Sequence, residues 1–292
     1  MMKPAVSLYS FAGYRRKTGA SLAECVDKAA EAGVKGVDIV PDDCGGGQEA
    51  LTAAADLGAR IRAAGMTAVC CCVGSDFLNA PGGVKKEADR VRRMVDLAAA
   101  YGCTLLRHDA TRGYPAAVKT KRGLEDVLDK LAEGYAIVTE YAAGCGIKTC
   151  VENHGFFMQD SYRVERLINA VGHPNFGALV DIGNFSCADE DNGKATGVLA
   201  PYAFHAHAKD FHIRSGREDD PGEGWFRLRG GNFLRGAILG HGNIAVGQCI
   251  GVLARAGYDG WLCLEFEGLE DSLDGIRIGL ANLGKLIDRY GR

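Results

Sequence analysis

The 292-residue sequence contains no long apolar run. No segment approaches the about 18 consecutive apolar residues that a membrane-spanning helix needs, and the amino-terminal stretch MMKPAVSLYSF lacks the apolar core and cleavage site of a secretory signal. Blocks of one charge are also missing, because 34 Lys and Arg are intermixed with 37 Asp and Glu. This composition argues against nucleic acid or an anionic membrane as a partner. We expect a cytoplasmic protein with small-molecule partners; homo-oligomerisation stays open.

The eleven cysteines are an odd number, and several lie inside apolar runs. The sequence therefore predicts free, buried thiols in a reducing compartment rather than a disulfide framework. Cys70, Cys71 and Cys72 are consecutive, but neighbouring residues of a strand point to opposite faces. The three thiols are thus not expected to converge on one metal ion.

A repeated pattern indicates alternating helices and strands. An amphipathic segment, a glycine and an apolar run recur, as in AEAGVKGVDIV at 30–40, GCGIKTCVEN at 144–153 and RAGYDGWLCLEFE at 255–267. Continuous apolar runs are typical of strands buried on both faces of a parallel sheet. The expected strands are 5–11, 36–40, 68–74, 104–109, 149–154, 177–183, 204–210 and 261–267. The expected helices are about 21–32, 49–64, 85–101, 121–144, 161–171, 190–200, 246–256 and 272–290.

Eight strands alternating with eight helices predict an α/β fold, the (β/α)₈ barrel. A doubly wound sheet usually has five or six strands and a glycine-rich phosphate loop after the first, whereas SFAGYRRKTG at 10–19 lacks GxGxxG. No linker or composition shift divides the chain, so we expect one domain over residues 1–292.

Polar residues end four successive apolar runs: Glu152, Asp181, His207 and Glu265. In a (β/α)₈ barrel the active site forms at the carboxyl ends of the strands, and a buried carboxylate is costly without a cation. Three oxygen donors and one nitrogen predict a single divalent metal ion, Mn²⁺, Co²⁺ or Mg²⁺ in preference to Zn²⁺. His205 shares a strand face with His207, so either could be the ligand; His207 is nearer the mouth.

The alternative is a structural network in which these acids pair with basic residues such as Lys209, Arg107 or Arg214. The long connection at 211–245 exceeds ordinary barrel loops, and we expect either a lid that brings Arg214 over the metal or a solvated surface excursion. Its basic residues could meet a phosphate or carboxylate on the substrate. No P-loop is present, so phosphorylation of the substrate stays open.

The sequence resembles the xylose isomerase-like TIM barrel superfamily, and within it the sugar phosphate isomerase/epimerase group that contains the D-tagatose and D-psicose 3-epimerases. The resemblance spans essentially the whole chain. It is carried by VENHG at 151–155, VDIGN at 180–184, HAHAKD at 205–210, LGHGNI at 239–244 and GYDGWLCLEFE at 257–267. Two positions depart from the tagatose-type pattern. Asn184 stands where that pattern has His, and Met158 stands where it has Glu.

The resemblance implies that Glu152, Asp181, His207 and Glu265 bind one divalent metal, and that the two glutamates also act as the acid/base pair. Our hypothesis is a sugar isomerase or epimerase that transfers a proton through an enediolate of a keto sugar or related polyol. Further substrate contacts are expected from His154, Asn184, Lys209, His108, Glu267 and Arg214. The alternatives are a lyase or dehydratase on a keto sugar or inosose at the same metal, and a non-catalytic sugar-binding barrel.

Overall fold

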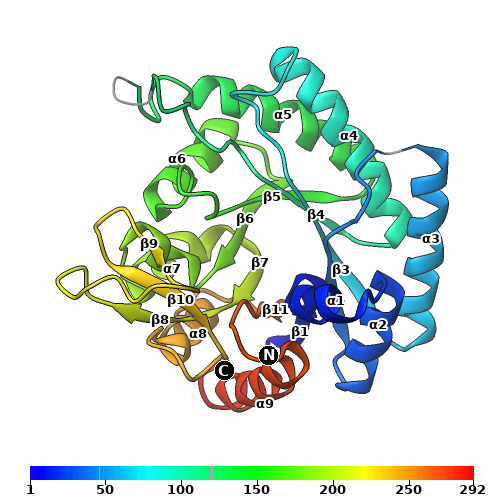
Figure 1. The fold of residues 1–292 in the computed structure, drawn as a ribbon. Coiled ribbons are helices and arrows are strands. Elements are labelled where there is room, and N and C mark those ends of the chain that lie inside the picture. Colours follow the sequence, from blue (N-terminus) through cyan, green and yellow to red (C-terminus); the bar gives the residue numbers. More distant parts are fainter. Residues whose placement is uncertain (46, 119–121) are drawn as a thin grey trace.

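Eight parallel strands close into a barrel in the computed structural model, which describes residues 1–45, 47–118 and 122–292 (Figure 1). The order around the barrel is β1-β11-β7-β6-β5-β4-β3-β2. Sequential strands thus lie side by side, as in a (β/α)₈ barrel. The barrel strands are β1 (Lys3–Ser7), β2 (Gly36–Ile39), β3 (Thr67–Val73), β4 (Leu105–His108), β5 (Lys148–Glu152), β6 (Phe176–Asp181), β7 (Ala203–Ala208) and β11 (Trp261–Leu264).

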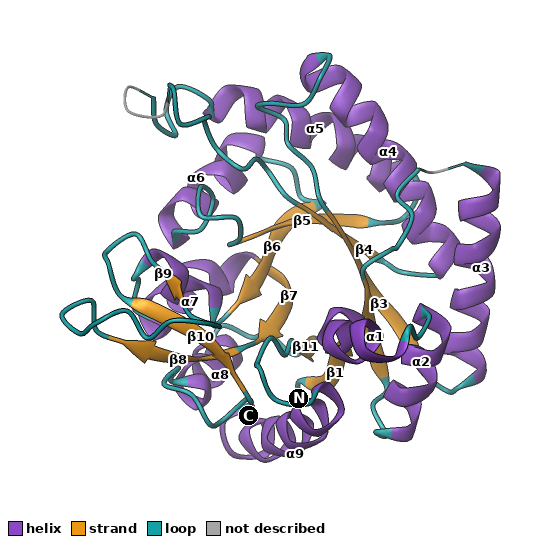
Figure 2. Ribbon diagram, viewed as in Figure 1, coloured by secondary structure: helices purple, strands orange, loops and turns teal. Residues whose placement is uncertain are grey.

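Helices surround the barrel and cover its outer face (Figure 2). They begin where the sequence provides caps. At α2, the Ser21 hydroxyl accepts a hydrogen bond from the Glu24 N–H at 3.2 Å, and the Glu24 carboxylate accepts one from the Ser21 N–H at 2.8 Å. The outer α-helices are α1 (Ala12–Thr18), α2 (Leu22–Glu31), α3 (Gln48–Ala63), α4 (Gly83–Tyr101), α5 (Leu128–Gly144), α6 (Ser161–Val171), α7 (Asn192–Leu199), α8 (Val246–Arg255) and α9 (Ser272–Tyr290).

The predicted (β/α)₈ architecture is confirmed, and each expected strand and helix has a counterpart. Two details differ. The short helix α1 follows the first strand, where only a loop was expected, and α5 begins at Leu128 instead of about 121, a residue outside the described part of the chain. The differences in the first strand and in α5 lie at element boundaries, which local sequence patterns define least well, whereas α1 is an additional short helix.

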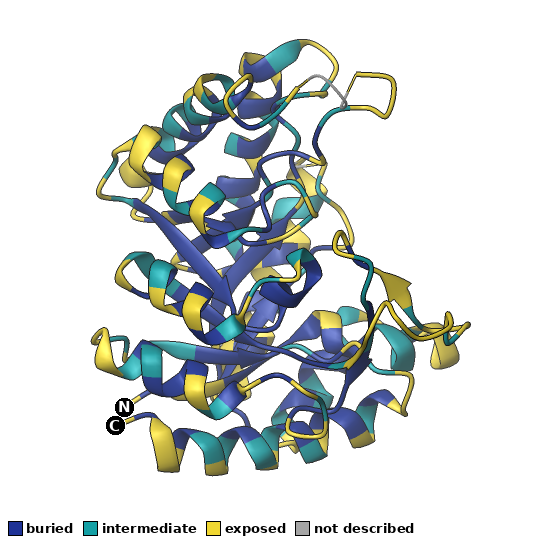
Figure 3. Cartoon of the chain, turned by 90° about the vertical axis from the view of Figure 1, so that its left-hand side faces the viewer, coloured by how far each residue is buried: buried dark blue, intermediate teal, exposed yellow. Residues whose placement is uncertain are grey.

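The apolar core has two layers, one on each side of the barrel wall. A large cluster fills the space between strands and helices, and a smaller one, which includes Val69, Leu105 and Leu179, lies inside the barrel. Cys71 belongs to the outer cluster, whereas Cys70 and Cys72 belong to the inner one. Figure 3 shows the barrel strands as buried. Strand alternation therefore places Cys71 on the opposite face from Cys70 and Cys72, so the three thiols do not converge, as predicted.

The segment after β7 forms a small antiparallel sheet of its own. Its order is β8 (Asp210–Arg214), β10 (Phe233–Ala237) and β9 (Phe226–Arg227), and it projects beside β7 and α7 (Figure 2). The Asp210 carboxylate anchors its base by accepting hydrogen bonds from the N–H groups of Gly240, Gly242 and Ile244 at 2.9 to 3.1 Å. We did not predict this sheet, because its strands are short and half exposed.

All eleven cysteines are free thiols, in agreement with the sequence analysis. Among the described residues, no helix combines the length and apolar character that crossing a membrane requires.

Candidate metal centre

Four side chains meet at the carboxyl ends of neighbouring strands. Glu152 ends β5, Asp181 ends β6, His207 lies near the end of β7, and Glu265 directly follows β11. One ligand atom of each lies within 4.8 Å of the others. His207 Nδ1 is 3.9 Å from Glu152 Oε1, 3.9 Å from Asp181 Oδ2 and 3.7 Å from Glu265 Oε2. The structure thus brings together the residues that the sequence pattern selected.

Two buried atoms of this group lack a hydrogen-bond partner among the described residues, Asp181 Oδ2 and His207 Nδ1. The other oxygen of Asp181 accepts hydrogen bonds from the N–H groups of Gly183 and Asn184 at 2.8 and 3.0 Å, which fixes the carboxylate. Unpaired buried polar atoms are rare and costly, and a divalent cation between them would satisfy both. The donor set therefore fits a metal ion.

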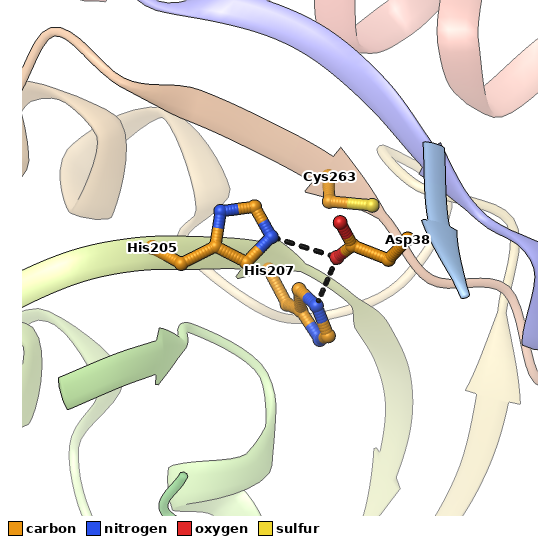
Figure 4. A group of neighbouring side chains, drawn as sticks. All are labelled: Asp38, His205, His207 and Cys263. Carbon is orange, nitrogen blue, oxygen red and sulfur yellow. Dashed lines mark hydrogen bonds and ion pairs between the residues drawn. The ribbon is translucent and has the colours of Figure 1, made fainter. Parts of the chain in front are cut away.

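Asp38 of β2 contacts the His207 ring through Nε2, the nitrogen that does not face the other three candidate ligands (Figure 4). His207 Nε2 and His205 Nε2 lie 2.9 and 2.7 Å from the same Asp38 oxygen. Donation of Nε2–H to a carboxylate leaves the Nδ1 lone pair directed at Glu152, Asp181 and Glu265, which is the arrangement of a metal-binding histidine. We did not predict Asp38, although the lone acid in the apolar run GVDIV was the available signal.

Cys263 lies beside Asp38 and the two histidines, and these four could also approach one ion (Figure 4). The separations of 2.7 and 2.9 Å between the histidines and Asp38 are hydrogen-bond lengths, however. We therefore interpret this second group as hydrogen-bonded support for His207. His205, the other histidine considered as a ligand, belongs to this second group and not to the group of Glu152, Asp181 and Glu265. Burial raises the pKa of Asp38, but the two histidines lower it to a net value below its ordinary range.

Two cations also contact the carboxylates. Lys209 Nζ lies 2.7 Å from Glu265 Oε2 and 3.4 Å from Asp181 Oδ2, and Arg107 Nε lies 2.5 Å from Glu152 Oε2. The pairs considered as a structural alternative thus exist at Lys209 and Arg107, in addition to the convergence of the four ligands. Arg214 makes no such contact; it pairs with Glu218 at 3.5 Å on the exposed small sheet.

These two cations do not neutralise the site. Arg107 is shared with Asp109 at 2.9 Å. Burial raises the pKa of Asp181, and the nearby Glu152 and Glu265 add to this effect against the opposing effect of Lys209, so that the net pKa is about 6. A bound metal ion would favour the ionised form of this buried carboxyl group and so offset the cost of its burial.

The pKa of Glu265 is shifted in the opposite direction to that of Asp181. Burial raises it, but Lys209 and His207 outweigh burial and lower it well below the ordinary value. For His207, burial lowers the pKa, while Glu265 and Asp38 raise it to a net value well above the ordinary one. Protons and a metal ion therefore compete for the same atoms of the site.

A cavity of about 240 Å³ opens above these residues. Its lining includes six of the predicted site residues, Glu152, His154, His207, Lys209, Glu265 and Glu267. It also includes Arg107 and Tyr9, which were not expected to contact substrate. Asn184 lies at its edge, where its Nδ2 donates to Glu152 Oε1 at 3.0 Å and its Oδ1 accepts from Lys209 at 3.3 Å. The predicted substrate-binding residues are therefore grouped, with two exceptions.

His108 is one exception, because β4 turns it away from the cavity. Arg107 faces the mouth, so the next side chain points toward the helices. The His108 ring is fully buried, stacks on Tyr135 at 4.2 Å and lies 3.1 Å from the Ser75 hydroxyl. Burial lowers its pKa to about 3. The other exception is the exposed Arg214, which lines neither this cavity nor its neighbour.

A second cavity of about 330 Å³ continues from the first and shares His154, Lys209 and Glu267 with it. Phe211 and Phe226 of the small sheet line it. The long connection at 211–245 thus places aromatic side chains next to the candidate metal centre. Its action as a lid stays a prediction.

The barrel and the position of its polar residues define a (β/α)₈ protein of the kind in which function resides at the carboxyl ends of the strands. The chain belongs to the xylose isomerase-like TIM barrel family, whose model matches residues 26–286. No curated protein matches it in sequence.

Three solved structures illustrate the shared fold. The probable 3-DHS dehydratase AsbF from Bacillus anthracis is 17% identical with a TM-score of 0.74, covering 97% of this chain and 99% of that one. D-Allulose 3-epimerase from Methylomonas sp. is 14% identical with a TM-score of 0.72 and 98% coverage of both chains. A xylose isomerase-like TIM barrel protein from Mycobacterium smegmatis in complex with magnesium is 16% identical with a TM-score of 0.73, covering 100% and 98%.

Proposed function

We propose that this protein is a divalent-metal-dependent sugar isomerase or epimerase that acts on a keto sugar or related polyol by proton transfer through an enediolate. The observation that carries the proposal is that two buried atoms without a hydrogen-bond partner among the described residues, Asp181 Oδ2 and His207 Nδ1, converge with Glu152 and Glu265. Similarity in fold to D-allulose 3-epimerase and L-ribulose 3-epimerase supports this choice of reaction.

Glu152, Asp181, His207 and Glu265 would hold the ion. Three carboxylates and one imidazole favour Mg²⁺, Mn²⁺ or Co²⁺, with Zn²⁺ as the less suited alternative. The magnesium complex of the M. smegmatis protein, which has the same fold, supports this assignment. When bound, such an ion polarises a carbonyl group and lowers the free energy of the neighbouring deprotonated carbon.

Glu152 and Glu265 move the proton in this proposal. They come from β5 and β11, which β6 and β7 separate in the barrel, so they approach the cavity from different sides. In this proposal one glutamate removes the proton from carbon and the other returns it, which inverts the centre when the two lie on opposite faces of the substrate. The charged Lys209, also in the cavity, stabilises the developing oxyanion.

The remaining polar side chains orient the substrate. His154, Asn184 and Glu267 border the two connected cavities and supply hydrogen-bond donors and acceptors for sugar hydroxyls. The segment 211–245 acts as a lid in this proposal, because Phe211 and Phe226 already line the second cavity and help to exclude water.

A lyase or dehydratase is the second candidate, supported by the similarity in fold to the probable 3-DHS dehydratase. The same glutamates would remove the proton. Lys209 or His154 would then protonate a departing hydroxyl group instead of allowing the proton to return to carbon.

The test begins with the metal content of the purified protein. A solvent-deuterium exchange screen against keto sugars, inososes and 3-keto-glycosides follows, with and without added Mg²⁺, Mn²⁺ or Co²⁺. We expect metal-dependent uptake of deuterium into the sugar, with no loss of water from it. Loss of one water from the product would favour the dehydratase. Sugar binding that survives metal removal, with no exchange under any condition, would contradict both enzymes.

A further inference from the structure

A third cavity, of about 550 Å³, lies between the loops after β4 and β5 and the small sheet. Four of its nine lining residues are arginines. The lining consists of Arg112, Gly113, Tyr114, Arg122, Gly123, Phe156, Phe157, Arg163 and Arg229. Such a density of guanidinium groups in one hollow is unusual for a protein whose charges are otherwise evenly mixed.

The acids beside this cavity are too few to neutralise it. Asp160 pairs with two of the arginines at 2.6 and 3.3 Å, and Asp126 pairs with a third at 3.5 Å. Arg112 forms no ion pair with any described residue. Among the described residues, the ion pairs thus join four guanidinium groups to two carboxylates, an excess of two positive charges within this set. Asp76 contacts only the backbone N–H of Arg112, at 3.4 Å.

The cavity also contains a strained aromatic residue. Phe156 has a φ of 63°, which is rare for a residue other than glycine, and its side chain is 51% exposed. Its N–H donates to Gln159 Oε1 at 2.8 Å, and its carbonyl accepts from Arg229 Nη2 at 2.6 Å. The surrounding structure therefore holds an exposed aromatic ring in a costly conformation, a feature that concentrates at ligand sites.

Phe156 connects this cavity to the candidate metal centre. It also lines the second cavity, together with His154, Lys209 and Glu267, and those three residues in turn line the cavity above the metal centre. The three hollows therefore form a row, with the carboxylate cluster at one end and the arginines at the other.

We propose that the arginine-lined cavity binds an anionic group, a phosphate or a carboxylate, at the end of the substrate remote from the reacting carbon. Guanidinium forks match the oxygen geometry of both anions, and the excess of two positive charges matches a phosphate monoester. The position of the reacting carbon rests on the proposed function, whereas anion binding by the arginines does not. This assignment would decide the substrate class, a sugar bearing a negatively charged end.

The test uses the full-length protein and compares Arg112→Ala, Arg229→Ala and the double variant with wild type. Arg92→Ala is the matched control, since Arg92 is 40% exposed and paired with Asp89, much as Arg229 is 43% exposed and paired with Asp160. Calorimetry on metal-stripped protein measures binding of inorganic phosphate and of acetate. Steady-state kinetics with metal compares D-fructose 6-phosphate with D-fructose. Thermal melting checks that each variant is folded.

We expect the double variant to bind phosphate about 10- to 100-fold more weakly, the range for losing charge-assisted hydrogen bonds, and the Arg92 control to bind normally. Its kcat/KM should fall for the phosphate ester and not for the free sugar. A preference for acetate over phosphate would uphold the anion site with a carboxylate as its ligand. Equal phosphate binding by wild type and double variant would overturn it.

The two proposals fail separately. Arginine-dependent phosphate binding without turnover of any sugar would uphold the anion site and contradict the proposed isomerase. Metal-dependent turnover of a sugar, together with phosphate binding that the arginine substitutions leave unchanged, would overturn the anion site and leave the isomerase standing.

Discussion

Two adjacent levels inside the same barrel differ sharply in chemistry. On β5 and β6, Cys150 and Leu179 belong to the apolar inner cluster, and two positions further along each strand stand Glu152 and Asp181. Residues two apart on a strand share a face and are separated by only about 7 Å. The barrel interior thus changes from an apolar layer to a charged one within a single repeat of the strand.

The apolar level, with Cys150 and Leu179, stabilises the fold, whereas the charged level above it, with Glu152 and Asp181, lowers the free energy of unfolding. Leu179 is fully buried among apolar neighbours, whereas Asp181 is equally buried and one of its oxygens has no hydrogen-bond partner among the described residues. Charged groups in such a place lower stability unless a ligand compensates them. We infer from this comparison that the charged residues at the carboxyl ends of the strands serve to bind a ligand. The following experiments test that inference.

The largest effect is expected at the two glutamates of the upper level. Glu152→Gln or Glu265→Gln should slow proton transfer by about 10²- to 10⁴-fold while much of the metal affinity remains. The amide oxygen can still coordinate a metal, but it cannot accept the proton from carbon. Solvent-deuterium exchange measures the first quantity and metal titration the second.

Asp181→Asn is the contrasting variant for this experiment, because its main defect should be loss of the metal. If both glutamine variants exchange deuterium at the wild-type rate with metal bound, the glutamates are not the bases, and His154 or Lys209 would take their place.

Two substitutions on β6 should change the stability of the metal-free protein in opposite directions. Leu179→Ala should lower the free energy of unfolding by about 2 to 5 kcal/mol, because it leaves a cavity in the apolar layer. Asp181→Asn should raise it by about 1 to 3 kcal/mol at pH 7, because it removes a buried charge that the site opposes. Denaturant unfolding in the presence of a chelator measures both.

The pH dependence supplies the control for Asp181→Asn. The pKa of Asp181 is raised from 3.8 to about 6, so its ionisation destabilises the fold as the pH rises through about 6. The advantage of the asparagine variant should therefore be present at pH 7 and absent near the ordinary pKa of 3.8. A stabilisation that persists unchanged at low pH would contradict the charge explanation.

A smaller effect on metal binding is expected from Asp38, which hydrogen-bonds to the candidate ligand His207. Asp38→Asn should weaken metal binding by about 10- to 100-fold, because the neutral amide keeps the shape but makes the His207 imidazole a weaker donor. Competition with a metal-sensitive dye measures this affinity. Thermal melting of the metal-free variant separates the effect from misfolding, and an affinity equal to that of wild type would show that Asp38 has only a packing role.

The smallest effect is expected on the surface of the small sheet. Arg214→Ala should change kcat/KM by less than about twofold, since Arg214 is exposed, pairs with Glu218 and lines neither of the two cavities next to the metal centre. A loss of tenfold or more would mean that the sheet closes over the barrel mouth during turnover and brings Arg214 to the substrate.

The strands and the four candidate ligands could be predicted from the sequence. Each strand is a short apolar run between a helix end and a polar residue, and the carboxyl ends of parallel strands in a barrel necessarily meet. Glu152, Asp181 and Glu265 were therefore identifiable as neighbours although more than one hundred positions separate the first from the last. That the chain folds as one domain with a lid remains a prediction.

The sequence by itself determined the barrel and the composition of its mouth, because both follow from local periodicity. Only the tertiary structure decided which side chains meet across the barrel. Asp38 on β2 contacts His207 on β7 across the barrel interior. The alternation of β4 directs Arg107 inward and His108 outward. Arg112 and Arg229 line one cavity although they are far apart in the sequence. These contacts depend on strand register and on the meeting of distant loops, which no local pattern encodes.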